Sequence, residues 1–169
     1  MASYWNEILT AISAQVASIP GIPPVIRRKR PVFYQDAKRT ICVSAVTDEI
    51  VPSEGTFAGP DMRRVVKINY TISVAILIQA NEQYQSDETD PDYLTLEWRE
   101  AIRQKLDQPR LSDLGAPPLP GADTVKNMDV ILGSVYDEGA MNKAYNDSRI
   151  TVVCESWEPA NGPNLSTME

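Results

Sequence analysis

A regular alternation of apolar and polar positions marks the middle of the chain. Between residues 66 and 78 every even-numbered position is apolar, and most odd-numbered positions are polar or small. Successive side chains of a β-strand point to opposite faces, so this segment is predicted to be one strand with one buried face. β-Branched residues dominate it, as a pleated, half-buried surface favours. At ~3.3 Å per residue it would reach roughly 40 Å, well beyond a typical strand of about 5–6 residues.

Two amphipathic helices are predicted, one before this strand and one after it. The first covers residues 4–18, with Ser3 as N-cap and Pro20-Gly21 after its end. The second covers residues 91–107, with Asp90 as N-cap and proline at the first helical position. Each has an apolar stripe at helical spacing, which we interpret as a core-packing face. The stripes are Trp5, Ile8, Leu9, Ile12, Val16 and Ile19, then Leu94, Trp98, Ala101, Ile102 and Leu106.

The remaining segments are predicted as short strands and loops. Strands are expected at 40–46, 125–132 and 149–157, and a short extended piece at 31–34. The segment 48–61 holds two prolines and two glycines among acidic residues, so it is predicted to be a long, functional loop. Further connections are expected at 82–90, 111–121 and 133–147, the last with one helical turn around 141–145. The simplest pairing joins strand 40–47 to the first half of strand 66–78 as an antiparallel hairpin.

The order helix, strand, strand, helix, strand, strand predicts an α+β, two-layer domain. Its sheet would be mostly antiparallel, with about four strands and the two amphipathic helices on one face. Residues 1–157 are predicted to form a single domain. Residues 158–169, rich in Pro, Gly, Asn and Ser, are predicted to be a flexible tail.

Composition adds limits to this picture. The 169 residues are 43% hydrophobic, which suits one domain with a core. The chain has no run of 18 apolar residues and no basic segment at its start, so neither a membrane span nor a secretory signal is expected. A formal net charge of −7 argues against wrapping nucleic acid over a broad surface. Cys42 and Cys154 lie in strand-like runs and are predicted to be buried thiols rather than a disulfide.

Catalytic chemistry has little support in the sequence. The chain has no histidine, which excludes histidine-dependent triads and Cys-His dyads. Its glycines are dispersed, its two cysteines lie more than a hundred residues apart, and its acidic run at 87–92 lacks the glycine and glutamate of a calcium loop. We therefore predict no enzyme activity, no catalytic, cofactor-binding or metal-binding residues, and no cofactor. A carboxylate pair brought together by the fold remains open.

Two surfaces are candidates for contact with another subunit or a partner. The odd-numbered side of strand 66–78 is small and uncharged, unlike the Lys/Glu-rich side that full solvation favours. A neighbouring subunit could pack there, although a solvated sheet face explains the residues equally well. The only dense basic cluster is interpreted as a contact with a partner protein or as a solvated loop, in preference to DNA, because the chain as a whole is acidic. The candidate interface residues are Asn69, Thr71, Ser73, Ala75, Arg27, Arg28, Lys29 and Arg30.

The C-terminal region resembles the tail terminator and neck (head-tail joining) proteins of long-tailed bacteriophages. The stretch AMNKAYNDSRITVVCESWEP has an aromatic-Asn/Asp-Ser pattern at 145–148 that leads into a last strand ending at Trp157-Glu158-Pro159. The segment IPGIPPV is similar to the end of that family's first helix and its turn. The segment DPDYLTLEWREAIRQKL sits where the family places its second helix.

This resemblance implies a non-enzymatic, structural virion protein of the phage neck or tail, assembled in the host cytoplasm. It implies a ring, usually a homohexamer, that terminates the tail tube and joins it to the head connector. The implied partners are the tail tube protein, a head connector or adaptor, and other neck proteins. DNA would pass through the lumen without specific binding, and no membrane would be involved.

Three alternatives remain beside this interpretation. A head-closure or head-tail adaptor protein of the neck would share the structural role and differ only in its contacts. A metal-dependent carboxylate hydrolase would need clustered Asp and Glu in a cleft, and it is the weakest alternative. A generic dimeric α+β binding domain would differ from a ring in its mass in solution.

Overall fold

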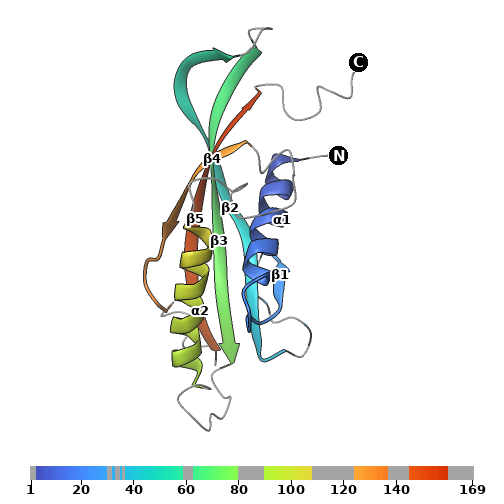
Figure 1. Cartoon of the computed structure of the whole chain (residues 1–169), viewed down its shortest axis with the longest axis vertical. Coiled ribbons are helices and arrows are strands. Elements are labelled where there is room, and N and C mark those ends of the chain that lie inside the picture. Colours follow the sequence, from blue (N-terminus) through green and yellow to red (C-terminus); the bar gives the residue numbers. More distant parts are fainter. Residues whose placement is uncertain are drawn as a thin grey trace.

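Seven helices and strands make up the part of the chain that the computed structural model describes. The described residues are 3–29, 32, 35, 37–58, 63–79, 90–107, 124–136 and 145–159, with backbone alone at 52–58, 63–64 and 159. Figure 1 shows the elements, which are α1 (Tyr4–Ala17), β1 (Val25–Arg27), β2 (Arg39–Ala58), β3 (Arg63–Gln79), α2 (Pro91–Leu106), β4 (Val125–Ile131) and β5 (Tyr145–Pro159).

The strands form one five-stranded sheet in the order β1-β2-β3-β5-β4. β1 runs parallel to β2, and every other neighbouring pair is antiparallel. The predicted α+β class with a mostly antiparallel sheet is therefore confirmed. The fifth strand is β1, which was not predicted because a three-residue strand is too short to display an alternating pattern.

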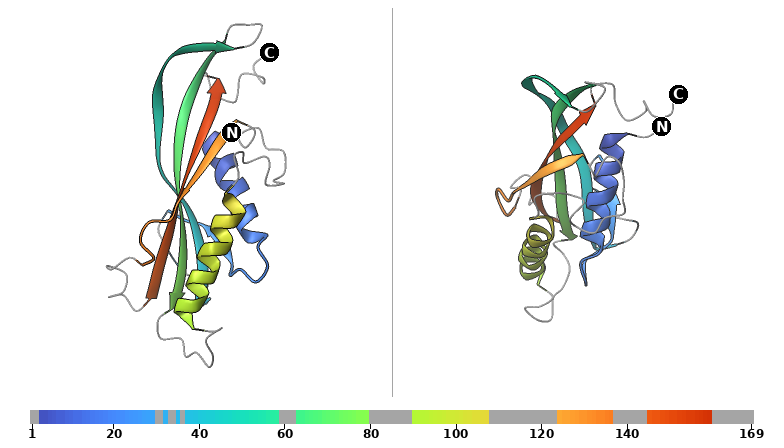
Figure 2. Two further views of the ribbon diagram at one scale, coloured as in Figure 1. Left: turned by 60° about the vertical axis from the view of Figure 1, so that its left-hand side comes forward. Right: turned by 45° about the horizontal axis from the view of Figure 1, so that its top comes forward.

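Both helices lie on the same face of the sheet (Figure 2, left). α1 packs on β1 and β2, α2 packs on β3, β4 and β5, and the two helices also contact each other. The predicted caps are confirmed, since the Ser3 side chain accepts from the Asn6 N–H and the Asp90 side chain accepts from the Asp92 N–H. The observed helix ends, Ala17 and Leu106, lie within one residue of the predicted ends.

The core lies between the helices and the even-numbered side of β3. Five of these side chains, from Tyr70 to Ile78, are at most 4% exposed and belong to one hydrophobic cluster with residues of both helices. The predicted strand 66–78 and its buried face are confirmed. The cluster includes Ile8, Ile12, Val16, Ile41, Val43, Ile72, Val74, Ile76, Trp98, Ile102, Leu106, Ile150 and Val152.

The long loop predicted at 48–61 is wrong for most of its length. Residues 48–58 continue β2, which pairs with β3 as far as Ala58 and Arg63. A shift of register between Val51 and Thr56 accommodates the proline and glycine that suggested a loop. The partner strand decides the outcome here, because the hydrogen bonds that extend β2 come from a distant segment of the chain. Residues 59–61 lie outside the described residues.

The last strand also runs further than predicted. Glu158 and Pro159, expected in the flexible tail, pair with Val66 and Val65 as the end of β5. The expectations for 82–89, 111–121, 141–144 and 160–169 fall outside the described residues. Of the extended piece predicted at 31–34, Val32 alone is described, and it belongs to no strand. No helix among the described residues is long and apolar enough to cross a bilayer.

Candidate functional site and assembly surfaces

The sheet face opposite the helices is the larger of the two predicted contact surfaces, and we call its upper part the open face. Asn69, Thr71 and Ser73 of β3 lie at its centre and are each partly exposed. Their register neighbours on the adjoining strands are also polar or partly exposed. The open face comprises Thr47, Glu49, Asn69, Thr71, Ser73, Asn127, Asp129, Ile131, Thr151, Val153 and Glu155. Contact of this face with another subunit or a partner stays a prediction.

Ala75, the fourth predicted contact residue of β3, is placed differently. Its side chain is 2% exposed and packs with Cys42 and Leu77 in a second small cluster, which Ile26 and Tyr145 flank. The Cys42 thiol donates to the carbonyl of Val32 at 3.2 Å, and both cysteines are free and buried as predicted. Ala75 is therefore covered within its own chain and offers no surface to a neighbour.

The described residues of the basic run, Arg27, Arg28 and Lys29, are all exposed, and Arg27 also bonds to α1. Arg27 donates to the Thr10 hydroxyl and to the Asn6 side-chain carbonyl, both at 3.0 Å, and so fastens β1 to α1. Arg28 and Lys29 are exposed and line a hollow of about 350 Å³ beside the start of the uncovered part of β2. Arg30 lies outside the described residues.

A buried carboxylate that the sequence analysis missed lies above the N-terminus of α1. Glu158 is 6% exposed and accepts from the Tyr70 hydroxyl, at 2.9 Å to both oxygens, and from the Ser156 hydroxyl at 3.0 Å. Nearby, Asp48 accepts from the Trp5 indole N–H at 2.7 Å, and the Trp5 ring meets the Tyr70 ring edge to face. Burial raises the pKa of Glu158, the two hydroxyl donors oppose that rise, and the charge of Asp48 adds to it. These bonds satisfy the carboxylate and indicate a structural role in joining β5, β3 and α1.

The raised pKa of Glu158 predicts a dependence of stability on pH. An acid whose pKa is higher in the folded state stabilises the fold fully below its unfolded pKa, and that stability is lost as pH rises through the folded pKa. Relative to a Glu158→Gln variant, the wild-type protein should therefore lose free energy of unfolding as pH rises from about 4 toward 7. Urea unfolding of both proteins across this range measures the difference. A difference that stays constant with pH, or grows in favour of the wild type, would contradict the prediction.

Arg99 of α2 is a second buried charged residue that the sequence analysis missed. It is 6% exposed, and its guanidinium donates to the Ser148 hydroxyl at 3.0 Å and to the carbonyls of Arg149, Leu132 and Gly133 at 2.9, 2.5 and 3.2 Å. Burial lowers its pKa. Its neighbours are backbone carbonyls and a hydroxyl from the end of β4 and the start of β5, which makes it a clamp between α2 and the sheet.

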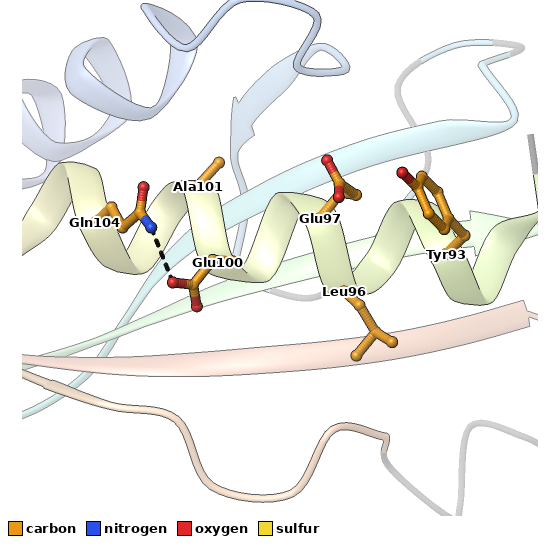
Figure 3. A pocket seen from close by; sticks show the side chains of 6 residues that line it. All are labelled: Tyr93, Leu96, Glu97, Glu100, Ala101 and Gln104. Atoms are coloured by element: carbon orange, nitrogen blue, oxygen red, sulfur yellow. Dashed lines mark hydrogen bonds between the residues drawn. The ribbon is translucent and has the colours of Figure 1, made fainter. Parts of the chain in front are cut away.

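The exposed side of α2 carries a shallow hollow of about 440 Å³, drawn in Figure 3. All six lining residues come from this one helix: Tyr93, Leu96, Glu97, Glu100, Ala101 and Gln104. The Gln104 amide donates to Glu100 at 2.9 Å, and hydrogen bonds from Arg103 and Gln104 lower the pKa of Glu100. A surface of one helix does not enclose a substrate, and within the described residues no second element lines the hollow opposite the two carboxylates.

The hydrolase alternative requires acidic residues gathered around a metal ion. Within the described part of the chain, no group of three or more Cys, Asp or Glu side chains has an arrangement that could hold one. The two buried acids that were not predicted, Glu158 and Asp147, are each held by side-chain donors, Glu158 as described and Asp147 by Arg149 at 2.8 Å. The described residues thus give this alternative no support.

Two of the residues that sequence reasoning missed, Ile50 and Glu158, follow from misplaced strand boundaries. Ile50 is 65% exposed on β2, but the segment 48–61 was predicted to be a loop. For Glu158 a signal existed, since the even-numbered series of β5 continues from Cys154 through Ser156 to Glu158 on the core face. Extending that alternation past Trp157 would have predicted a buried carboxylate.

Comparison with known proteins finds similarity to solved structures. No protein-family model matches the chain, and no curated protein matches it. A solved structure of the sheath/tube terminator of an extracellular contractile injection system (PVC, extended state) is similar, with a TM-score of 0.48 and 8% sequence identity. The match covers 93% of this chain, which spans 58% of the length of that protein. A likeness at this level establishes neither family nor function.

Proposed function

We propose that this protein is a structural component that forms a ring at the end of a tail tube, as the tail terminator of a long-tailed phage does. In this role it would stop tube polymerisation and join the tube to the head connector at the neck. The ring would be a homohexamer of the virion, assembled in the host cytoplasm. The protein would act by binding neighbouring subunits and other tail proteins rather than by catalysing a reaction.

The observation that carries this proposal is a sheet that extends past its helical layer, with both described helices on the same face. β2 and β3 continue above the upper end of α1 (Figure 1). Ile50 therefore remains 65% exposed although it pairs with Ile68. A small soluble domain gains nothing from such an extension, whereas a ring subunit needs surfaces for neighbours in its own ring and in the adjoining tube. The resemblance of the segments 4–25, 90–106 and 140–159 to neck proteins supports the same role.

The charge of the chain supports passage of DNA without adhesion. Each chain carries a formal charge of −7, so six copies would carry about −42, six times that value. Attraction to the phosphate backbone requires basic side chains, whose interactions dominate protein–DNA affinity. The polar open face, with Asp129, Glu49 and Glu155, suits a water-filled lumen. A positive potential along the lumen of the assembled ring would contradict this part of the proposal.

The proposal is tested first by the mass and shape of the purified full-length protein. Mass photometry should show a species near 113 kDa, six times the chain mass of 18.8 kDa. Negative-stain electron microscopy should show closed rings with a central hole. Light scattering separates this result from a dimer, which the generic binding-domain alternative predicts.

The terminator role itself is tested with the tail tube protein encoded in the same genome. Added during polymerisation of the tube protein, the ring should stop elongation and appear at one end of each tube in electron micrographs. An equal amount of an unrelated acidic protein is the control. Tubes of unchanged length and without a terminal ring would contradict the terminator role even where the protein forms rings.

A further inference from the structure

The sheet has two edges that no described strand covers. On one side, β1 pairs with residues 41–43 of β2, and β2 continues beyond it to Ala58. On the other side, β4 is the last strand of the sheet. Among the described residues, the outer edge of β2 above Val43 and the outer edge of β4 therefore have no strand partner. Open strand edges present unpaired backbone N–H and C=O groups and are templates for pairing with another chain.

The two edges lie at the same level of the sheet. Following the register across the strands, Ser44 pairs with Ser73, Ser73 with Thr151, and Thr151 with Ile131. At the upper end, Glu49 leads through Asn69 and Glu155 to Asn127 in the same way. The stretch 44–50 that β1 leaves uncovered thus spans the same level as the whole of β4, with one bulged residue in each strand, Val46 in β2 and Lys126 in β4.

The directions of the strands also permit the edges to meet. β2 is antiparallel to β3, β3 to β5, and β5 to β4, so β2 and β4 run in opposite directions. Two copies related by rotation about an axis parallel to the strands would place β4 of one beside β2 of the next. The new pair would be antiparallel, like its neighbours in the sheet, and repetition of this contact closes a ring.

Exposed apolar side chains and charged side chains lie along both edges. Six large hydrophobic side chains are exposed among the described residues, and three lie on these edges: Val46 at 59%, Ile50 at 65% and Ile131 at 53%. The head-to-tail arrangement also brings acidic Glu49 of β2 to the level of Asn127 on β4, whose chain neighbour is basic Lys126. Asp129 of β4 comes to the level of Thr47, and Ile131 comes to the level of Ser44, where Arg28 and Lys29 flank the start of the uncovered edge of β2. Burial of exposed apolar groups and pairing of opposite charges favour this contact.

We infer that copies of this chain join head to tail through the 44–50 edge of β2 and the 125–131 edge of β4, forming one sheet that runs around the ring. This inference rests on the ring of the proposed function and adds the surface that builds it. The helices would lie on one side of the continuous sheet, and the open face would lie on the other. The predicted contact at Asn69, Thr71 and Ser73 is then not the contact between subunits.

Engineered disulfides test the inference directly in the full-length protein. We choose the double variants Thr47→Cys/Asp129→Cys and Glu49→Cys/Asn127→Cys, whose positions share the open-face side of the two edges. Within one chain these positions are separated by three strand spacings, about 14 Å, while a disulfide requires Cα atoms within ~7 Å. Any disulfide between them therefore joins two copies. Strand tilt in a closed sheet shifts the register, so neighbouring pairs within 45–49 and 127–131 are scanned as well.

Mild oxidation of the assembled protein should give a ladder of linked chains that ends at the size of the ring. The wild type is the control, because Cys42 and Cys154 are buried, and burial raises the pKa of the Cys154 thiol to about 12. Each single-cysteine variant is a second control. Dimers of a single-cysteine variant would reveal pairing of like edges and would overturn the head-to-tail arrangement.

The results of these experiments distinguish a failure of the edge contact from a failure of ring formation. Rings of the wild type without linkage in any double variant would overturn the edge contact and leave the ring standing. A wild type that stays monomeric at high concentration would overturn both. The sequence-based alternative is tested with Ser73→Arg, which should assemble normally. Loss of assembly in Ser73→Arg with normal assembly of the edge variants would place the contact on the open face instead.

Charged substitutions at the edges give an independent measurement. The Val46→Lys/Ile131→Lys variant should associate more weakly by roughly tenfold or more, because lysine on an open strand edge opposes pairing. As a dissociated monomer, this variant should have the same melting temperature as the dissociated wild type, because the side chains of Val46 and Ile131 are already exposed. The matched control is Leu96→Lys, at a position on α2 that is 48% exposed and lies away from both edges. Equal association of the two variants would contradict the inference.

Discussion

An Ile72→Asp variant is expected to lose about 4 kcal/mol or more of its free energy of unfolding, which is a large fraction of the stability of a typical domain. Ile72 lies at the centre of β3, is fully buried, and pairs with Ala45 and Val152 on the neighbouring strands. An aspartate there would be ionised without a partner or would fold only in its neutral form. Urea unfolding monitored by circular dichroism measures the loss, and poor solubility of the variant is part of the expected result.

The matched control is Ser73→Asp, at the next residue of the same strand. Ser73 points to the open face and is partly exposed, so its aspartate keeps contact with water. The same charge on the same strand should therefore change the free energy of unfolding by less than ~1 kcal/mol. An Ile72→Asp protein that is soluble and melts like the wild type would show that the even-numbered side of β3 is not the core.

The features that local chemistry decides could be predicted from the sequence. Ser3 and the pair Asp90-Pro91 mark the beginnings of the helices, because side-chain caps and a proline at the first helical position act on their own segment. The alternation in 66–78 predicted the buried side of β3 because period two determines the face of a strand wherever it pairs. The single layer of helices followed from two stripes and one apolar sheet face.

The features that distant segments decide could not be predicted. Residues 48–58 contain loop-forming residues, yet pairing with β3 makes them a strand. Ala75 has the same small, uncharged character as Ser73, but a local cluster with Cys42 and Leu77 covers it. The open edges of the sheet depend on strand order, and a sequence pattern does not specify which strands are outermost. For this reason the sequence suggested a face as the contact surface, and the register across the whole sheet was needed to suggest the edges.

Arg99 is a single residue whose environment also depends on distant segments of the chain and could not be predicted from the sequence. Charged side chains are seldom buried, so an arginine between apolar positions of α2 is assigned to the solvent side by default. The carbonyls that it binds belong to segments 33 to 50 residues away, at the end of β4 and the start of β5. Only the fold brings these acceptors together at one point beneath the helix. An arginine can satisfy them because its planar guanidinium carries five donors in a fixed fork.

An Arg99→Ala variant is accordingly expected to lose about 3 kcal/mol of its free energy of unfolding. The substitution leaves the carbonyls of Leu132, Gly133 and Arg149 without their side-chain donor and leaves a void beneath α2. Arg99→Lys should recover part of the loss, because a single ammonium cannot reach acceptors on both strands in the same geometry. Urea unfolding measures the loss. Amide hydrogen exchange should become faster at 132–134 and 148–149, where the clamp holds the strands to the helix.

The matched control is Arg103→Ala, one turn further along α2. Arg103 bonds Glu100 within the same helix and lies on its outer side, where water competes for the pair. Its loss should leave the unfolding midpoint and the exchange at 132–134 close to those of the wild type. If Arg99→Ala unfolds at the same urea concentration as Arg103→Ala, then the carbonyls find water in place of the guanidinium. In that case the hydrogen bonds of Arg99 would contribute no net stability, and packing of the apolar stripe alone would hold α2 on the sheet.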